Sequence, residues 1–160
     1  MIREVQLSDA AQIANIYNYY VKNSTVTFEE KEVSITEFEK RISSIKANFP
    51  YLVFEEKGTI IGYAYASTFR TRVAYRFSAE SSVYIHHKHY RKGIGSKLYH
   101  SLIPLMKQSG LKSAIGGITL PNDASINLHE SLGFTKVGHF KEVGYKFSTW
   151  LDVGFWQLEL

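Results

Sequence analysis

The first fifty residues carry one strand-like pattern followed by two helix-like patterns. Apolar and polar residues alternate over residues 2–7, as they do in a half-buried strand. Ser8 then stands where an N-cap would start a helix that runs to about Val21, with apolar side chains on one face. Ser34 and Glu37 have the spacing of a capping box ahead of a second amphipathic helix, which we expect to end before the next proline.

The middle of the chain is typical of strands joined by loops. Residues 51–55 and 59–68 are strand-like and flank Lys57-Gly58, a dipeptide that favours a tight turn, so they predict a hairpin. A polar loop that carries arginines follows over residues 69–78. Residues 81–85 are short, apolar and rich in β-formers, and they predict a further strand.

The second half begins with a helix and ends in antiparallel strands. A helical pattern over about residues 93–108 contains Pro104, which we expect either to kink the helix or to end it early. Residues 113–120 predict a strand that two glycines weaken. Pro121-Asn122-Asp123 turns the chain into a short helix that stops at the following glycine, and residues 134–160 predict two or three antiparallel strands.

This order of elements decides the fold class. The succession β-α-α-β-β-β-α-β-α-β-β predicts an α/β fold with a central mixed, mostly antiparallel sheet flanked by helices. A doubly wound dinucleotide-binding fold would need repeated βαβ units, which the pattern lacks. No linker, repeat or change of composition interrupts residues 1–160, so we expect a single domain.

Composition narrows the chemistry more than it narrows the fold. The 160 residues include no cysteine, which excludes a disulfide framework, a thiolate zinc site and a cysteine nucleophile. The formal net charge of +4 is compatible with an anionic ligand, with nucleic acid or with a merely basic surface, but no stacking or recognition motif for nucleic acid is present. No apolar run is long enough to span a bilayer and no signal peptide is visible. We therefore expect a cytoplasmic protein that binds neither membrane nor nucleic acid.

The basic residues are densest between Lys88 and Lys97, where Gly93 and Gly95 stand at a predicted helix start. Glycine lets the backbone approach a ligand, and the first N–H groups of a helix lack partners and carry partial positive charge. Together with the neighbouring cationic side chains, they form a site for an anion such as phosphate. The Walker pattern and the third glycine of a Rossmann fingerprint are both missing, so neither of those nucleotide sites is expected.

The segment Tyr90-Arg91-Lys92-Gly93-Ile94-Gly95 resembles the acetyl-CoA loop of the GNAT superfamily of N-acetyltransferases. In that superfamily the pattern is Gln or Arg, two residues of any kind, Gly, one residue of any kind, then Gly or Ala. Tyr90 stands at the Gln or Arg position, which alters one side-chain contact and leaves the backbone amides in place. The resemblance covers essentially the whole chain and points to the phosphinothricin acetyltransferase-like branch. The blocks that carry it are Ile16-Tyr17-Asn18, 24–29, 62–66, 80–85, 122–125, Leu128-His129-Glu130, Leu132-Gly133-Phe134, 144–147 and Trp150-Leu151-Asp152.

The resemblance implies acetyl-CoA as the co-substrate. The diphosphate is expected on the glycine turn, and the pantetheine arm is expected between two splayed strands, residues 81–85 and 113–120. Gly116-Gly117 would ease that opening, and an unpaired N–H of the first strand is the expected donor to the oxyanion. Asn122 suits either a cofactor contact or the cap of the short helix. The expected cofactor-binding residues are Val83, Tyr84, Ile85, Arg91, Lys92, Gly93, Ile94, Gly95, Ser96 and Asn122.

Two side chains are candidates for proton transfer. By resemblance, Glu80 is the general base that takes a proton from the acceptor amine, although a carboxylate there could instead only pair with the substrate ammonium or with an arginine. His129 stands where many GNAT members carry the tyrosine that protonates the departing thiolate, and histidine can do the same work. The alternative for His129 is a structural role. Without a cysteine to carry the acetyl group, we expect direct attack within a ternary complex.

The acceptor is expected to be a small, amino-acid-like amine. Arg70, Arg72 and Tyr75 lie in the loop before Glu80, and guanidinium groups pair well with carboxylate or phosphinate, although loop arginines are often only solvated. Phe28 is expected to close the other side of the pocket. The resemblance suggests phosphinothricin, methionine sulfoximine or methionine sulfone as acceptors. Other amines remain possible acceptors (an aminoglycoside, a polyamine or a protein N-terminus), and so does a non-catalytic acetyl-CoA-binding role.

Two further expectations concern metal and assembly. His86, His87 and His89 cluster near the glycine turn, but no carboxylate or cysteine stands at ligand spacing, so no metal site is expected. Members of the phosphinothricin acetyltransferase-like branch are commonly homodimers, and by resemblance we expect a homodimer here.

Overall fold

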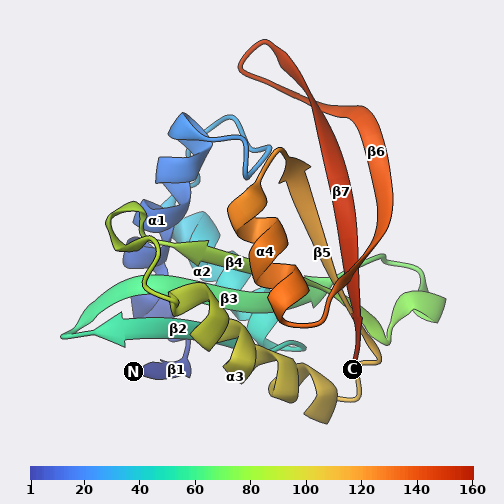
Figure 1. Cartoon of the computed structure of the whole chain (residues 1–160). Helices are drawn as coiled ribbons and strands as arrows, with labels where there is room; N and C mark the ends of the chain where they lie inside the picture. The colour runs from blue at the N-terminus through green and yellow to red at the C-terminus, as the bar shows by residue number, and fades with distance from the viewer.

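In the computed structural model, which describes residues 1–160, a seven-stranded sheet is flanked by helices (Figure 1). The strand order is β1-β2-β3-β4-β5-β7-β6, and every neighbouring pair is antiparallel except β4 with β5. The strands are β1 (Ile2–Glu4), β2 (Tyr51–Glu56), β3 (Thr59–Thr68), β4 (Ser78–Ile85), β5 (Ser113–Leu120), β6 (Thr135–Lys146) and β7 (Thr149–Glu159). The helices are α1 (Ala10–Asn23), α2 (Ile35–Lys46), α3 (Ile94–Gln108) and α4 (Asp123–Ser131). This order of elements and the mixed, mostly antiparallel sheet confirm the predicted fold class.

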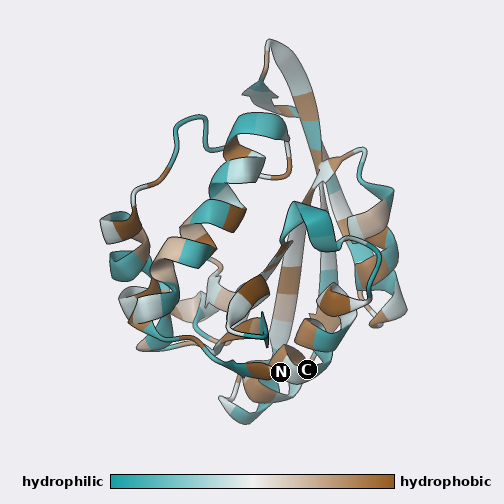
Figure 2. Ribbon diagram, turned by 90° about the vertical axis from the view of Figure 1, so that its left-hand side faces the viewer, coloured by the Kyte–Doolittle hydropathy of each residue, from teal (hydrophilic) through white to brown (hydrophobic).

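Two hydrophobic cores lie on opposite faces of the sheet. Helices α1 and α2 pack on one face, and α3 and α4 pack on the other (Figure 2). Because side chains alternate along a strand, β2 serves both cores: Tyr51 and Val53 belong to the first, and Leu52 belongs to the second. The strands of the sheet centre are therefore buried on both sides. No helix of the chain is long and apolar enough to cross a membrane.

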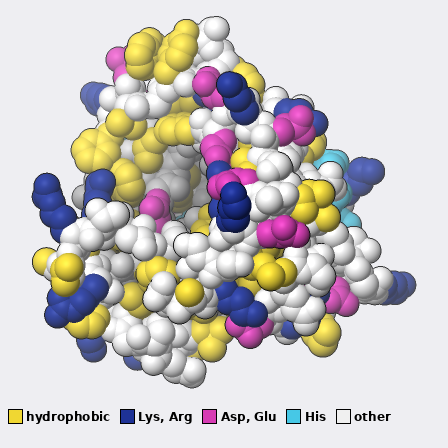
Figure 3. Space-filling model, turned by 180° about the vertical axis from the view of Figure 1, so that it is seen from behind, with side chains coloured by type: hydrophobic (Ala, Val, Ile, Leu, Met, Phe, Trp, Pro, Cys, Tyr) yellow, Lys and Arg dark blue, Asp and Glu magenta, His cyan; other side chains and the backbone are white.

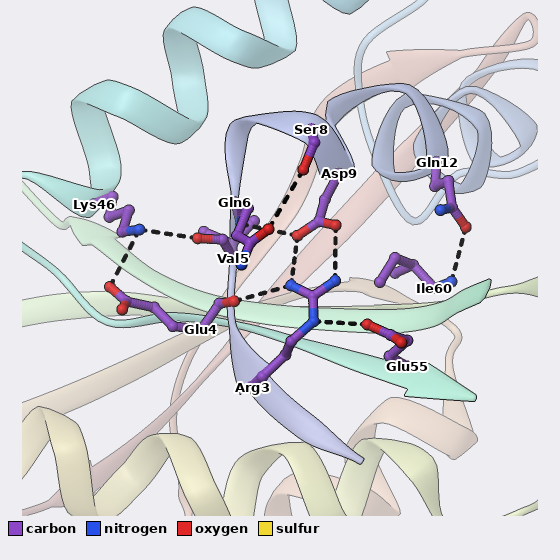
Figure 4. A network of polar contacts seen from close by, with 10 residues as sticks. All are labelled: Arg3, Glu4, Val5, Gln6, Ser8, Asp9, Gln12, Lys46, Glu55 and Ile60. Carbon is purple, nitrogen blue, oxygen red and sulfur yellow. Dashed lines mark hydrogen bonds and ion pairs between the residues drawn. The ribbon is translucent and has the colours of Figure 1, made fainter. Parts of the chain in front are cut away.

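The start of α1 differs from the prediction because a buried carboxylate, and not Ser8, organises it (Figure 4). The guanidinium of Arg3 donates two hydrogen bonds to Asp9, of 2.8 and 2.9 Å, and its Nε donates one of 2.7 Å to Glu55. Asp9 also accepts the backbone N–H of Gln6 at 2.8 Å. This network ends β1 at Glu4 and forms a 3-10 turn that contains Ser8, so the predicted N-cap at Ser8 and the strand over residues 2–7 are both wrong in detail.

Other predicted boundaries are confirmed or shifted. Ser34 caps α2 by accepting the N–H of Glu37 at 3.1 Å, as predicted. Lys57 and Gly58 turn the β2–β3 hairpin with positive φ values of 51° and 79°. The helix α3 runs past Pro104 to Gln108, so this proline does not end it early.

Strand β4 is longer than the sequence indicated. It begins at Ser78, so Glu80 lies inside the strand, paired with Ile115 of β5, and not in the loop before it. The last part of the chain forms two strands, β6 and β7. Gly138 and Gly144 lie within β6, where the pairing with β7 shifts register.

Candidate active site

The parallel strands β4 and β5 separate after a short paired region. Only Ser78–Glu80 pair with Ser113–Ile115, and beyond this point residues 81–85 and 116–120 diverge. The gap between them is a cleft of about 480 Å³, lined by residues of α1, β4, α3, β5, α4 and the loops beside them. This volume lies within the range of small-molecule sites. The predicted splay of these two strands is confirmed.

His129 lies at the α4 wall of the cleft with a defined tautomer. Its side chain is buried, and its Nδ1 lies 2.7 Å from the carbonyl oxygen of Ser125. Because a carbonyl only accepts, Nδ1 carries the proton, and in the neutral ring Nε2 is the free acceptor. Nε2 lies 3.3 Å from the hydroxyl of Tyr99. Burial lowers the pKa of His129, so the neutral ring is favoured, and the Ser125 hydrogen bond opposes this shift in part.

Gly116 makes room for that ring. A Cβ at this position would lie 2.6 Å from Nε2 of His129, which is well inside any normal contact. The glycine therefore serves the fit of α4 against β5, in addition to any easing of the strand separation. The structure thus explains why a glycine is needed at position 116, which the sequence pattern did not reveal.

Ser81 and Tyr99 extend the polar wall of the cleft. The Tyr99 hydroxyl lies 3.3 Å from both the Ser81 hydroxyl on β4 and Nε2 of His129, so one buried hydroxyl joins three elements. Burial raises the pKa of Tyr99, so its hydroxyl stays protonated and can donate. Neither residue was predicted as part of the site, because a serine in a strand and an apolar-face tyrosine on a helix are ordinary core features.

Glu80 does not line the cleft: it is the last residue of β4 that still pairs with β5, directly before Ser81, where the lining on β4 begins. Its Oε1 lies 3.4 Å from the point where a Cβ of Gly117 would stand, and Gly117 lines the cleft. Burial raises the pKa of the Glu80 carboxyl, and the charge of Arg70 opposes this rise. A half-buried carboxylate of raised pKa can take up a proton at a pH closer to neutrality than an exposed one can.

The glycine turn has the shape that an anion site requires. Arg91 and Gly93 both adopt positive φ, at 59° and 69°, and the first hydrogen bond of α3 runs from the N–H of Lys97 to the carbonyl of Gly93 at 3.1 Å. The amides of Ile94, Gly95 and Ser96 precede that bond and have no partner within the helix. These amides and the nearby cationic side chains fit a diphosphate.

Tyr90, which stands at the Gln or Arg position of the loop pattern, makes a contact of a different kind. Its hydroxyl donates to the hydroxyl of Tyr20 on α1 at 2.8 Å, and Tyr20 in turn donates to the carbonyl oxygen of Ile85. This chain of hydroxyls fastens the glycine turn to α1 and to the end of β4. The departure from the family pattern thus falls on a residue that holds the loop in place.

Five of the ten predicted cofactor residues line the cleft, and the other five lie together at the start of α3. Lining residues that were predicted are Val83, Tyr84, Ile85, Arg91, Asn122 and His129. Lys92, Gly93, Ile94, Gly95 and Ser96 lie at the start of α3. Asn122 accepts the N–H of Ser125 at 3.1 Å, so its helix-capping role is confirmed while it also lines the cleft.

The predicted acceptor residues lie outside the cleft lining. Arg70, Arg72 and Tyr75 are in the exposed loop between β3 and β4, and Phe28 lies over Gly144 of β6. Ser24 and Val26, from the same loop as Phe28, line the cleft instead.

The histidines near the glycine turn stack on one another and do not form a metal site. The ring centroids of His86 and His87 lie 4.6 Å apart, and His87 stacks on Tyr19 at 3.9 Å. No group of three or more histidine, cysteine or acidic side chains of the chain is placed to hold a metal ion.

Named proteins and solved structures resemble this chain in sequence and fold over most of their length. A profile of the acetyltransferase (GNAT) domain matches residues 2–154. A phosphinothricin N-acetyltransferase of Streptomyces viridochromogenes is 41% identical over 156 residues, covering 98% of this chain and 85% of that protein. The L-methionine sulfoximine/L-methionine sulfone acetyltransferase of Salmonella typhimurium is 37% identical over 163 residues, covering 99% and 94%. The crystal structure of a GNAT superfamily phosphinothricin acetyltransferase from Sinorhizobium meliloti in complex with AcCoA has a TM-score of 0.96, with 40% identity and coverage of 100% of this chain and 88% of that one.

The sequence match, the diverging strands and the glycine turn all support the same family assignment. The chain belongs to the GNAT family of acetyltransferases.

Proposed function

We propose that residues 1–160 act as one domain that transfers the acetyl group of acetyl-CoA to the α-amine of a small amino-acid-like acceptor. Phosphinothricin, methionine sulfoximine and methionine sulfone are the acceptors that the names of the relatives suggest. The observation that carries the proposal is the cleft between β4 and β5, which has His129 in its wall and the Glu80 carboxylate beside its lining residue Gly117.

Each part of acetyl-CoA is assigned to a different part of the site. The amides at the start of α3, with Arg91 and Lys92, bind the diphosphate of acetyl-CoA. The pantetheine arm lies between the diverging strands, along Val83–Ile85, with Asn122 beside it. Acetyl-CoA supplies the activated thioester, and a strand amide that has lost its neighbour donates to the developing oxyanion.

Glu80 and His129 divide the proton transfers between them. Glu80 takes the proton from the acceptor ammonium or from the attacking amine, directly or through water. The amine nitrogen forms the new bond to the acetyl carbon, and the thioester bond breaks. The CoA thiolate takes a proton from Nε2 of the His129 imidazolium, a proton that the neutral ring has first taken up from solvent, and Glu80 later releases the amine proton to solvent. Burial makes that imidazolium a stronger acid than free histidine, because it lowers the pKa of His129. The acetyl group moves in one step between substrates, since the chain has no cysteine to hold it.

The loop between β3 and β4 supplies charge for the acceptor. Arg70 is close enough to Glu80 to act on its pKa, so an acceptor whose ammonium meets Glu80 places its acidic group within reach of this loop. We assign Arg70, Arg72 and Tyr75 to that contact. A polyamine would meet arginines where it needs carboxylates, so the amino-acid-like acceptor is favoured over the polyamine.

An acceptor screen tests the proposal. The purified protein is given acetyl-CoA with phosphinothricin, methionine sulfoximine, methionine sulfone, ordinary amino acids, a polyamine and an aminoglycoside, and released thiol is measured. We expect kcat/KM for the amino-acid-like acceptors to exceed that for the others by ~10²-fold or more, equivalent to roughly 2.7 kcal/mol. Cofactor binding without thiol release from any acceptor, or a preference for the polyamine, would contradict it.

Assembly and location form the finer part of the proposal. The β6–β7 hairpin exposes a cluster of large apolar side chains, which suits a second copy of the chain and supports a homodimer. Its members are Phe140, Val143, Tyr145, Phe147 and Trp150, each between 53% and 62% exposed. Light scattering on the purified protein measures this directly, and a monomer at micromolar concentration would contradict it. Acetyl-CoA as co-substrate favours a cytoplasmic location.

A further inference from the structure

Lys146, at the end of β6, is a buried ammonium group with an unusual set of partners. The residue is 1% exposed, and its Nζ donates to the carbonyl oxygens of Ser24 at 2.7 Å and Thr27 at 2.9 Å. The Phe147 ring lies under the ammonium, with its centroid 4.9 Å from Nζ. The two carbonyls belong to the loop that follows α1, more than a hundred residues away in the sequence. One side chain of β6 thus holds both ends of a short segment, residues 24–27.

A buried ammonium group at this position is not explained by folding stability alone. No carboxylate lies within ion-pair distance of Lys146. Burial lowers its pKa and the charge of Glu30 opposes this only in part, so the folded protein keeps the charged form at an energetic disadvantage. A well-packed apolar side chain in such a place is often as stable or more so. The two carbonyl contacts are what an apolar side chain could not supply, and they fix the position of the loop.

The loop is fastened by two further contacts. The Thr27 hydroxyl shares a hydrogen bond of 2.6 Å with the hydroxyl of Tyr17 on α1. The Phe28 ring lies against Gly144 of β6 so closely that a Cβ there would be 2.4 Å from ring atoms. Residues 24–28 are therefore docked on β6 by Lys146 and Gly144, two positions apart on the same strand face.

The docked loop forms part of the candidate active site. Ser24 carries one of the two carbonyls that accept from Lys146, and Val26 stands between them in the sequence; both line the cleft that also contains His129. Figure 3 shows a hollow on the face opposite to that of Figure 1, bordered largely by hydrophobic side chains, on the side where the β6–β7 hairpin rises. Helix α1 and its loop lie on that same face of the sheet, whereas the glycine turn belongs to the face of α3 (Figure 1).

We propose that Lys146, together with Gly144, is a positioning residue that holds residues 24–28 as the acceptor-side wall of the active site. The inference rests on the proposed acetyl transfer and adds to it a determinant of acceptor binding on β6. Phe28, by this reasoning, acts through its seat on Gly144, not by touching the acceptor.

Steady-state kinetics of Lys146→Met test the proposal, with Lys141→Met as the matched control. Lys141 is an exposed lysine of the same strand, so both variants lose one positive charge. We expect Lys146→Met to raise the acceptor KM by ~10-fold, with the KM for acetyl-CoA changed less than ~2-fold, since only the acceptor-side wall loosens. A purely structural role would lower the active fraction, and thus the apparent kcat, while leaving both KM values unchanged.

A second variant keeps the test decisive if Lys146→Met does not fold. Gly144→Ala leaves the lysine in place and displaces only the Phe28 ring, so the same rise in acceptor KM is expected, whereas Gly138→Ala, where a Cβ meets nothing within 4 Å, should behave as wild type. Hydrogen exchange on residues 24–28 without substrates should be faster in both loop variants than in wild type.

The outcomes distinguish a failure of the proposed function from a failure of the role assigned to Lys146 and Gly144. A wild-type protein with no activity on any amino-acid-like acceptor refutes the proposed function. An active wild type, with folded Lys146→Met or Gly144→Ala that retains the wild-type acceptor KM and the wild-type exchange of residues 24–28, overturns the role of this clamp.

Discussion

Replacing Gly116 by alanine should disable the His129 side of the candidate active site while leaving the proposed cofactor site intact. The new methyl group would lie 2.6 Å from Nε2 and 2.8 Å from Cδ2 of the His129 ring. To restore an ordinary contact of 3.4 Å, the ring must retreat by about 0.8 Å from β5.

A retreat of that size reaches both hydrogen bonds that orient the ring. The bond of Nδ1 to the Ser125 carbonyl is 2.7 Å and the contact of Nε2 with the Tyr99 hydroxyl is 3.3 Å, so neither survives unchanged. Because misplacing a catalytic group by ~1 Å can cost on the order of 10²-fold in rate, we expect kcat to fall between ~10-fold and ~10²-fold. The KM for acetyl-CoA should change by less than ~2-fold.

Thiol-release kinetics in a double-mutant cycle with His129→Ala provide the assay. If the alanine at 116 acts through His129, it should cost little in the His129→Ala background, because the group that it displaces is already gone. Gly138→Ala, which meets no atom within 4 Å, serves as the control for glycine replacement in a strand. Wild-type kcat in Gly116→Ala, or a loss of equal size with and without His129, would refute the reasoning.

Three other expectations follow from the polar groups. Glu80→Gln should lower kcat at neutral pH by ~10²-fold or more if the carboxylate is the general base, and near-normal turnover would remove it from that role. The acidic limb of the pH profile of kcat/KM should lie at a higher pH than the ordinary pKa of a glutamate, because burial raises the pKa of Glu80. Arg70→Leu should move this limb to still higher pH, because the Arg70 charge opposes that rise. A limb that does not move would show that Glu80 is not the group that titrates. Asp9→Asn should lower the free energy of unfolding near pH 7 by about 2 kcal/mol in urea titrations. The Arg3 hydrogen bonds hold the folded pKa of Asp9 below its unfolded value, so this contribution is complete above the unfolded pKa and disappears as pH falls through the folded one; a deficit that persists in strong acid would contradict it.

The fold could be predicted from the sequence because local patterns and long-range order agree. The β2–β3 turn at Lys57-Gly58 and the cap at Ser34 are local signals that the structure confirms. Ser8 misled because the turn before α1 is held by Asp9 through its ion pair with Arg3, which also binds Glu55. An ion-paired network between residues far apart in the sequence leaves no periodic signal. Glu80 was placed before its strand for a similar reason, since its neighbour in the sheet, Ile115, is known only once the strands pair.

In the candidate site, too, local features could be predicted from the sequence and contacts between distant residues could not. The glycine turn is contiguous in sequence and could be recognised there. Tyr99 and Lys146 could not be, because a tyrosine on the apolar face of a helix and a lysine in a strand have common structural explanations. Their roles come from contacts with Ser81, His129 and the loop after α1, which only the packed structure brings together.

The most direct test is a crystal structure of the protein with bound coenzyme A. We predict diphosphate oxygens within hydrogen-bond distance of the amides of Ile94, Gly95 and Ser96, and the pantetheine arm between residues 81–85 and 116–120. An ordered coenzyme bound elsewhere, with those amides turned away from it and the cleft between β4 and β5 empty, would contradict the proposed site.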